Sequence, residues 1–419
     1  MISSAASPQI PQIPPIAIRN QRVQSSVALR EPDVVPFAPT MNNYYALNYG
    51  VTIRDAMTDL LCLAGPLNKF IDRYDPDLLN SPTFFPIPPM QLSGYTAARW
   101  AGSREGLGPN TPYQYVDRQY LEDEDYDEFI ADPSRFILKK LLPKKHTEFA
   151  GLALIDLQML CGQSIYNLAS LGLPPVRRAL ETMIKTGELI MENLAQAARL
   201  DMMCIERGYP VFGGAVALCP FDEFADYVRG LLTACLDCIT EPDRLRLAVE
   251  RWGDVTIPAA IAGAKMQRAE YLFIPLHCGT DEFMSRENYR KFYWPPLKRL
   301  LDAAIEAELT PFVLCEGKYF TRLDIISDVQ AGKVIYCFEN TDFSQAKKIL
   351  GASACIAGGM PTAYLMSGSR QRVVDETKRM LDICAPGGGF IMSNSLALDS
   401  VSAENMDAWR ETILAYGKY

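Results

Sequence analysis

The sequence predicts an α/β fold, arranged as a closed (β/α)8 barrel with an N-terminal extension and long irregular loops near the barrel mouth. Five strand-then-helix units follow one another between Tyr271 and Tyr419, and such alternation implies a right-handed parallel sheet. About eight strand-like apolar runs occur in the whole chain, which is the number that a barrel requires. The alternative is an open doubly wound sheet, but no G-x-G-x-x-G motif follows the first strand.

The composition excludes several classes of function. The chain has 419 residues, of which 48% are hydrophobic, so it can bury a sizeable core. The net charge of −9 argues against a nucleic-acid partner, because phosphate binding needs a basic face. No apolar stretch of about 18 residues exists, so no membrane-spanning helix is expected. The 11 cysteines are irregularly spaced and no signal segment precedes them, which predicts a cytoplasmic protein.

The N-terminal part of the chain predicts an arm, a strand, a helix and a long loop. Residues 1–30 are rich in Pro, Ser and Gln and are expected to form a flexible or surface-draped arm, which leaves one barrel domain over 31–419. A first strand, VVPFAP, lies within 31–50, and 52–72 has the pattern of a helix. Residues 80–118 are rich in Pro, Gly and aromatics, which suits a binding loop or lid; a surface excursion is the alternative.

The middle of the chain is mainly helical. Residues 119–145 predict an acidic helix that gives way to a second one, and 148–206 have alanine and leucine at helical spacing. GYPVFGGAVAL at 208–218 predicts a buried strand, and helices follow in PFDEFADYVRG and from 241–252.

Each of the last five strands ends on polar, reactive or glycine residues. Because the carboxyl ends of parallel strands open on one face, residues far apart in sequence are expected to converge there on one pocket. These residues are His277 and Cys278, Cys315 and Glu316, Glu339 and Asp342, Gly358 and Gly359, and Ser393 and Asn394.

Several phrases carry a resemblance to a known superfamily. They include DEFMSRENYRKFYWPPLKRLLDAAIEAEL, GKVIYCFENTDFSQAKKILGASACIAGGMPTAYL and GGGFIMSNSLALDS in the C-terminal third, and REPDVVPFAP and PFDEFADYVRG before it. The chain resembles the uroporphyrinogen decarboxylase superfamily over most of residues 30–419. That resemblance implies a (β/α)8 barrel with the active site at its C-terminal mouth. It also implies either decarboxylation of a porphyrin precursor or methyl transfer with a corrinoid protein.

Two departures from the decarboxylase pattern favour the methyltransferase branch. The chain lacks both an arginine motif of the type RQAGRYLPE and a phenylalanine-serine-aspartate turn. A substrate with many carboxylates also needs a basic pocket, which the charge balance does not suggest. We therefore expect a methyltransferase that acts on a small molecule and a corrinoid carried by a partner protein. The alternatives are a porphyrin-pathway decarboxylase and a non-catalytic ligand-binding barrel. We also consider that the protein forms a homodimer.

The zinc ligands of the methyltransferase branch are replaced in this chain. The resemblance aligns Leu314 and Glu316 with a His-x-Cys pair and Leu396 with a later Cys. Leucine cannot bind zinc, so the family's zinc site is expected to be absent from its usual place. Glu316 remains as the best single acid–base candidate.

Catalytic and metal-binding residues are expected at the strand ends. Imidazole suits proton transfer, so His277 is a catalytic candidate, although a core histidine bonded to backbone is the alternative. Glu316 and Glu339 are the carboxylate candidates, because a carboxylate at a barrel mouth can move a proton. A displaced metal site would use His277, Cys278 and Cys315; two buried thiols are the alternative.

Substrate-binding residues are expected around the same mouth. Tyrosine provides an aromatic wall with a hydroxyl group for an apolar or ring-shaped ligand, although each tyrosine alone has an ordinary structural alternative. The substrate-binding candidates are Tyr319, Tyr44, Tyr45, Tyr95, Asn394 and Lys318, of which Lys318 is also a candidate partner for Glu339.

Overall fold

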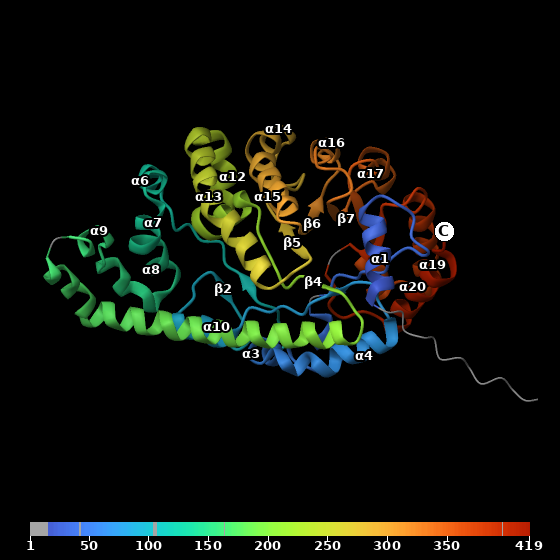
Figure 1. The fold of residues 1–419 in the computed structure, drawn as a ribbon, viewed down its shortest axis with the longest axis horizontal. Coiled ribbons are helices and arrows are strands. Elements are labelled where there is room, and N and C mark those ends of the chain that lie inside the picture. Colours follow the sequence, from blue (N-terminus) through green and yellow to red (C-terminus); the bar gives the residue numbers. More distant parts are fainter. Residues whose placement is uncertain (1–15, 42, 104–106, 163, 396) are drawn as a thin grey trace, which may run out of the picture.

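The computed structural model describes residues 16–41, 43–103, 107–162, 164–395 and 397–419. Its fold is α/β, with a parallel five-stranded sheet in the order β5-β6-β7-β8-β9 and helices around it (Figure 1). Two short pairs accompany this sheet, the parallel pair β1–β4 and the antiparallel pair β2–β3. Within the described residues, no helix is both long enough and apolar enough to traverse a lipid bilayer.

The strands of the structure are short. Their bounds are β1 Leu79–Asn80, β2 Ala98–Arg99, β3 Gln114–Tyr115, β4 Val211–Phe212, β5 Tyr271–Leu276, β6 Thr310–Lys318, β7 Ile335–Asn340, β8 Cys355–Met360 and β9 Phe390–Asn394.

The helices fall into two groups by length. The long ones are α1 Ile16–Val27, α4 Ala64–Tyr74, α10 Pro174–Glu206, α12 Leu231–Thr240, α13 Pro242–Met266, α15 Trp294–Glu306, α17 Phe343–Leu350, α19 Arg370–Cys384 and α20 Ala403–Tyr416. The short α-helices are α2 Tyr44–Leu47, α3 Ile53–Thr58, α5 Ile87–Ser93, α6 Tyr126–Ala131, α7 Pro133–Phe136, α8 Leu142–Lys145, α9 Leu157–Leu160, α11 Pro220–Phe224, α14 Arg286–Asn288, α16 Leu323–Ile326 and α18 Thr362–Ser367.

Side chains of the main sheet alternate between two buried clusters, as the pleat of a strand requires. Phe312 and Leu314 of β6 belong to the cluster on one face. Val313 and Cys315 belong to the larger cluster on the other face, together with Leu297 of α15. Both faces are therefore apolar, which explains why the strands have continuous apolar sequences.

Parallel backbone pairing continues past both edges of the five strands. Beyond β9, Phe37 forms a parallel bridge with Met392, and the Leu78 amide donates to the Phe37 carbonyl at 3.4 Å. Beyond β5, Val216 forms a parallel bridge with Phe273. The first predicted strand and the predicted strand at 208–218 are thus extended segments beside the sheet, although only short parts of them have regular ladders.

Part of the expected N-terminal arm packs against the sheet, whereas its composition suggests a flexible or surface-draped segment. Residues 16–27 form α1, and the side chains of Val23 and Val27 join the same cluster as Phe312. Arg19 is buried on this helix as well. The spacing of four residues between the two valines places both on one face, which is why this part of the arm packs. Residues 1–15 lie outside the described residues.

The long middle helix dominates the shape of the molecule. The predicted helical region 148–206 divides into two short turns, α9 and the 33-residue helix α10. Figure 1 shows α10 running along one edge, with α6 to α9 gathered at the end that extends past the sheet. The predicted loop 80–118 is mostly irregular in its described residues, where the regular elements after β1 are α5 and the pair β2–β3.

Candidate active site at the strand ends

His277 follows the last residue of β5 and is held by two aspartates. Its Nδ1 lies 2.7 Å from Asp226 Oδ2, and its backbone amide donates to Asp222 Oδ2 at 3.1 Å. Asp222 is on α11, and Asp226 is on the π-helical turn η6, Ala225–Arg229, that continues it. Among the described residues no hydrogen bond to His277 Nε2 is found, so this nitrogen remains available to a ligand.

Asp222 holds the backbone at the end of β5 through hydrogen bonds. It is fully buried, and besides the His277 amide it accepts hydrogen bonds from the Cys278 amide at 2.8 Å and from the Tyr293 hydroxyl. Burial raises the pKa of Asp222, while the charge of His277 opposes this rise. These hydrogen bonds therefore stabilise the charged form of Asp222 against the effect of burial. They also fix the backbone that carries His277.

The surroundings of His277 favour the imidazolium form. Burial disfavours its charge, but the hydrogen bond to Asp226 and the charges of Asp222 and Glu316 prevail and raise the pKa of His277 to about 10. The side chain is 31% exposed. A charged imidazole that solvent can reach is suited to donate a proton.

Glu316 shares the mouth with His277. It follows Leu314 on the same face of β6, because alternate residues of a strand point the same way. Burial raises the pKa of Glu316, His277 opposes this rise, and Glu339 adds to it. A carboxyl with a raised pKa beside a charged imidazole is the arrangement expected of an acid–base pair.

Glu339 forms a hydrogen bond with the backbone near the end of β6. Its Oε2 accepts a hydrogen bond from the Gly317 amide at 2.6 Å. Gly317 has φ +75°, and a Cβ there would lie 2.7 Å from Thr280 Oγ1, so glycine is required at this close approach. Glu339 of β7 therefore fixes the backbone directly after Glu316.

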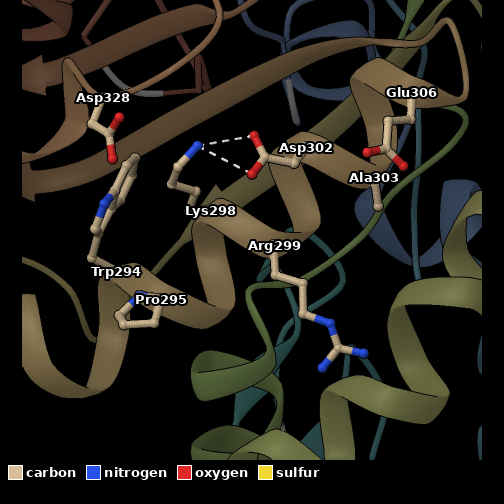
Figure 2. Close-up of a pocket in the computed structure, with 8 residues that line it drawn as sticks. All are labelled: Trp294, Pro295, Lys298, Arg299, Asp302, Ala303, Glu306 and Asp328. Atoms are coloured by element: carbon tan, nitrogen blue, oxygen red, sulfur yellow. Dashed lines mark hydrogen bonds and ion pairs between the residues drawn. The ribbon is translucent and has the colours of Figure 1, made fainter.

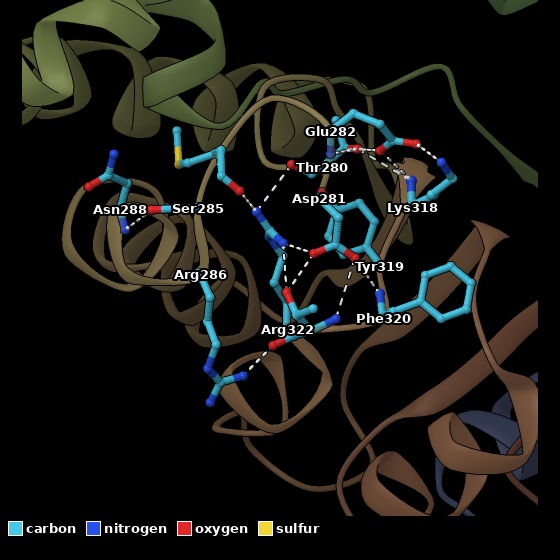
Figure 3. A network of polar contacts seen from close by, with 12 residues as sticks. Thr280, Asp281, Glu282, Ser285, Arg286, Asn288, Lys318, Tyr319, Phe320 and Arg322 are labelled. Atoms are coloured by element: carbon cyan, nitrogen blue, oxygen red, sulfur yellow. Dashed lines mark hydrogen bonds and ion pairs between the residues drawn. The ribbon is translucent and has the colours of Figure 1, made fainter.

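A polar network joins the loops that follow β5 and β6 (Figure 3). Lys318 pairs through Nζ with Glu282 Oε1 at 3.1 Å, and so its partner is Glu282 rather than the expected Glu339. Arg322 is 1% exposed; it pairs with Asp281 and donates to the Thr280 carbonyl at 3.1 Å. This network holds one wall of the mouth in place.

Tyrosines from the irregular loop line the other side of the site. The Tyr115 hydroxyl donates to the Asp226 carbonyl, and the Tyr115 ring centroid lies 6.1 Å from that of Tyr227. Burial of its hydroxyl, then the charges of Glu316 and Asp226, raise the pKa of Tyr113. The loop 80–118 thus reaches the mouth, as its composition suggested.

Lys145 and Tyr95 lie beside this aromatic wall. Lys145 Nζ is 4.4 Å from the centroid of the Tyr227 ring. Burial lowers the pKa of Lys145 to about 8, and Glu223 opposes that fall. Burial raises the pKa of Tyr227, and the charge interaction with the neighbouring Tyr95 adds to this rise. Of the four tyrosines proposed as substrate contacts, Tyr95 is therefore the one that the structure places near this wall.

The other three tyrosines proposed as substrate contacts lie in the core. Tyr44 and Tyr45 are buried, and their hydroxyls bond to Tyr74 and to the Asn80 carbonyl. Tyr319 is fully buried in the cluster that faces the helices.

Asn394 is also committed to the fold. Its Oδ1 accepts from the Thr40 amide at 2.8 Å, and its Nδ2 donates to the Thr40 carbonyl at 3.0 Å. The side chain therefore joins the N-terminal segment to β9.

The proposed metal ligands are not brought together. His277 faces the mouth, whereas Cys278 and Cys315 belong to the cluster on the opposite face. The thiol of Cys235 on α12 and burial raise the pKa of Cys278, which places that thiol among the helices. Consecutive strand residues point to opposite faces, so adjacency in sequence separates these ligands in space. In the described part of the chain, no group of three or more His, Cys, Asp or Glu side chains is arranged to hold a metal ion.

A hollow on the outer side of α15 is separate from this site (Figure 2). In it Lys298 pairs with Asp302 at 3.1 Å, as expected of an (i, i+4) pair on a helix surface. The residues that line the hollow are Trp294, Pro295, Lys298, Arg299, Asp302, Ala303, Glu306 and Asp328, and none of them is a predicted site residue.

Asp222 and Asp226 were missed as site residues by reasoning from sequence. They lie four residues apart in PFDEFADYVRG, so a helix brings both carboxylates to one side. Both are buried. Two aspartates among apolar residues at this spacing are the signal that could have identified them, because buried carboxylates are rare without partners.

Comparison with known proteins identifies the family. A family model for uroporphyrinogen decarboxylase matches residues 179–416, which is more than half of the chain. The chain belongs to the uroporphyrinogen decarboxylase family. Among solved structures, a methyltransferase from Methanosarcina mazei is similar with a TM-score of 0.62 at 13% identity, over 95% of this chain and 98% of that chain. At this identity the likeness shows a shared fold. No curated protein sequence matches.

Proposed function

We propose that this family member is a methyltransferase that moves a methyl group between a small molecule and a corrinoid protein. The observation that supports it most is the pair formed by His277, held through Nδ1 by Asp226, and the part-buried Glu316 at the adjacent strand end. The structural similarity to the Methanosarcina methyltransferase adds support at the level of the fold.

The charge of the mouth favours this reaction over decarboxylation of a porphyrin precursor. Asp226, Glu316 and Glu339 contribute carboxylates, while Lys318 is paired with Glu282 and Arg322 is buried with Asp281. A substrate with many carboxylates would be repelled by such a surface. A neutral or cationic small molecule suits it better.

In this scheme the protein orients the small molecule and manages one proton. His277 Nε2 donates that proton to the heteroatom from which the methyl group leaves, because an uncharged leaving group departs more easily. Asp226 keeps the imidazole charged and fixes its orientation through Nδ1. The corrinoid supplies the methyl-exchanging metal centre from the partner protein.

Zinc does not fit the residues at the family's ligand positions. Leu314 lies at the place of the family histidine, and Cys315 faces the helices. Leu396 lies outside the described residues. No step of the scheme therefore passes through zinc.

We also infer that the parallel contacts beyond β5 and β9 close the sheet into a (β/α)8 barrel over residues 31–419. The bridges of Phe37 to Met392 and of Val216 to Phe273 support this closure. A cytoplasmic location accords with the described cysteines, all of which are unpaired.

Methyl transfer can be tested with purified protein and a corrinoid protein reduced to the cobalt(I) state, by following the corrinoid absorbance as methylated thiols, methylamines and methyl ethers are supplied. Glu316→Gln is expected to lower kcat by about 10²- to 10⁴-fold, as loss of an acid–base group does. Glu306→Gln, in the outer hollow of Figure 2, is the matched control and should leave the rate unchanged. Release of carbon dioxide from uroporphyrinogen without methyl transfer would contradict the proposal, and so would full activity of Glu316→Gln.

A further inference from the structure

One side of α10 carries an exposed apolar stripe. Ile184, Met191 and Met202 are 65%, 64% and 51% exposed. The apolar residues recur at intervals of three or four, so they lie in line along the helix. We call this set the α10 stripe: Ile184, Gly187, Met191, Leu194, Ala195, Ala198, Met202 and Ile205.

The α10 stripe faces away from the rest of its own chain. Thr186, Leu200 and Cys204 on the opposite side of the helix are buried, and they hold α10 against the molecule. Figure 1 shows α10 running along one side of the fold, with α3 and α4 beside its C-terminal half. From Ile184 to Ile205 the stripe extends about 32 Å at 1.5 Å per residue. A contiguous apolar surface of this length is typical of an interaction site.

Gly187 gives an independent indication of a close neighbour. It lies in the interior of α10, where glycine costs about 1 kcal/mol relative to alanine. A Cβ at this position would meet open space, so no contact within the described chain requires glycine there. A second helix that approaches closely would require a small residue, and it would also explain Ala195 and Ala198 on the same side.

We propose that the α10 stripe binds the α10 stripe of a second copy of this chain, with the two helices antiparallel. An axis between Leu194 and Ala195 places each large side chain opposite a small one. Met191 then meets Ala198 of the second copy, and Met202 meets Gly187. Such alternation of large and small residues across an interface gives close packing.

Charges beside the stripe favour the antiparallel arrangement. Lys185, Glu188, Glu192, Arg199 and Glu206 lie along one flank. About the same axis, Arg199 lies near Glu188 and Glu192 of the second copy, and Lys185 lies near its Glu206. In a parallel pair related by a two-fold axis, this flank would instead face the opposite flank of the second copy, where the apolar Met183 and Ile190 lie, and the charges would lack partners. The flank is therefore complementary to itself only when the helices run in opposite directions.

The oligomeric state of the full chain tests the proposal directly. Sedimentation equilibrium should give a dimer for the wild type. Met191→Lys should raise the dimer dissociation constant by roughly 100-fold or more, since the change enters the interface twice. Met266→Lys, at an 80% exposed methionine on α13, is the matched control and should remain dimeric. A monomeric wild type would overturn the proposal and would indicate that the stripe binds a different protein. A dimer that Met191→Lys leaves unchanged would also overturn it.

Single cysteines test the direction of the helices. Ala195→Cys lies at the proposed axis and should form a disulfide with its own copy under mild oxidation. Ile184→Cys should not, because its counterpart would lie about 30 Å away; crosslinking should appear only when Ile184→Cys and Ile205→Cys are combined. The wild type measures the background from the native cysteines. Self-crosslinking of Ile184→Cys alone would indicate a parallel pair and contradict the proposed arrangement.

Charge reversal and Gly187 test the details of the interface. Arg199→Glu should weaken the dimer, and the addition of Glu188→Arg and Glu192→Arg should restore it. Gly187→Met should prevent dimerisation without lowering the melting temperature of the monomer, because the added side chain meets nothing in its own chain and methionine favours a helix more than glycine does. A dimer that tolerates Gly187→Met at unchanged affinity would contradict the close approach.

Discussion

The two histidines of this chain have opposite surroundings. His277 is bonded to Asp226, and its pKa is raised to about 10 against the effect of burial. His146 donates to or accepts from the Ser93 hydroxyl at 2.9 Å. Burial and the charge of Lys145 lower the pKa of His146 to about 4. At neutral pH one imidazole is therefore charged and the other neutral, and only the charged one lies in the candidate site.

NMR titration of the two histidines can test this difference. We expect His146 to stay neutral and His277 to stay charged through pH 7 in the wild type. Because the pKa of His277 rises on folding from an ordinary 6.5, its charge stabilises the fold fully below pH 6.5. That contribution should disappear as the pH rises through about 10. Asp226→Asn should move the His277 titration down and leave that of His146 unchanged. A wild-type His277 that titrates near 6.5 would contradict the proposed role of Asp226.

The loops after β5 and β6 act as one structural element because a buried arginine joins them. Arg322 reaches Asp281 and the Thr280 carbonyl, both of which follow β5. Burial lowers the pKa of Arg322 to about 10. A second pair, Arg286 with Asp324, joins neighbouring parts of the same region at 2.6 Å, but both of its side chains are largely exposed.

The different burial of the two arginines leads to different costs on removal. Arg322→Ala should lower the free energy of unfolding by about 3 kcal/mol, since it removes the cationic partner of the partly buried Asp281 and the hydrogen bonds to the Thr280 and Met284 carbonyls. Arg286→Ala should cost less than about 1 kcal/mol, because water replaces an exposed partner. Urea unfolding of both variants measures these values. If both variants lose the same free energy of unfolding, the burial of Arg322 does not increase its contribution to stability.

At the scale of the whole molecule, α1 belongs to the packed structure. Val23 is fully buried and lies in the cluster formed by the inner side chains of the strands. Ile18, on the other side of the same helix, is 39% exposed. We therefore infer that the domain begins before residue 31, the expected boundary.

Substitutions on the two sides of α1 test this boundary. Val23→Asp should destabilise the protein by about 4 kcal/mol or more, because it buries a charge without a partner. Ile18→Asp should change the stability by less than about 0.5 kcal/mol, as is usual for an exposed site. Thermal unfolding of both proteins provides the measurement. If Val23→Asp melts like the wild type, α1 is a dispensable arm.

Much of the fold and part of the site could be predicted from the residues. The five strands from Tyr271 onward were predicted because their apolar runs are continuous, and His277 and Glu316 because polar residues end those runs. Tyr44, Tyr45 and Tyr319 could not be judged in this way, since a tyrosine on a wall and a tyrosine in a core have the same local sequence. Their burial depends on segments far away in the chain.

The α/β class, the order of the C-terminal strands and the family can be inferred from the residues alone, because they follow from local periodicity and from motifs. Which strand-end residues meet depends on how distant segments pack. The tertiary structure places His277 beside Asp226 and turns Cys278 and Cys315 to the opposite face. The physical reason is that the pleat of a strand fixes the direction of each side chain, while its neighbours come from whichever helix packs there.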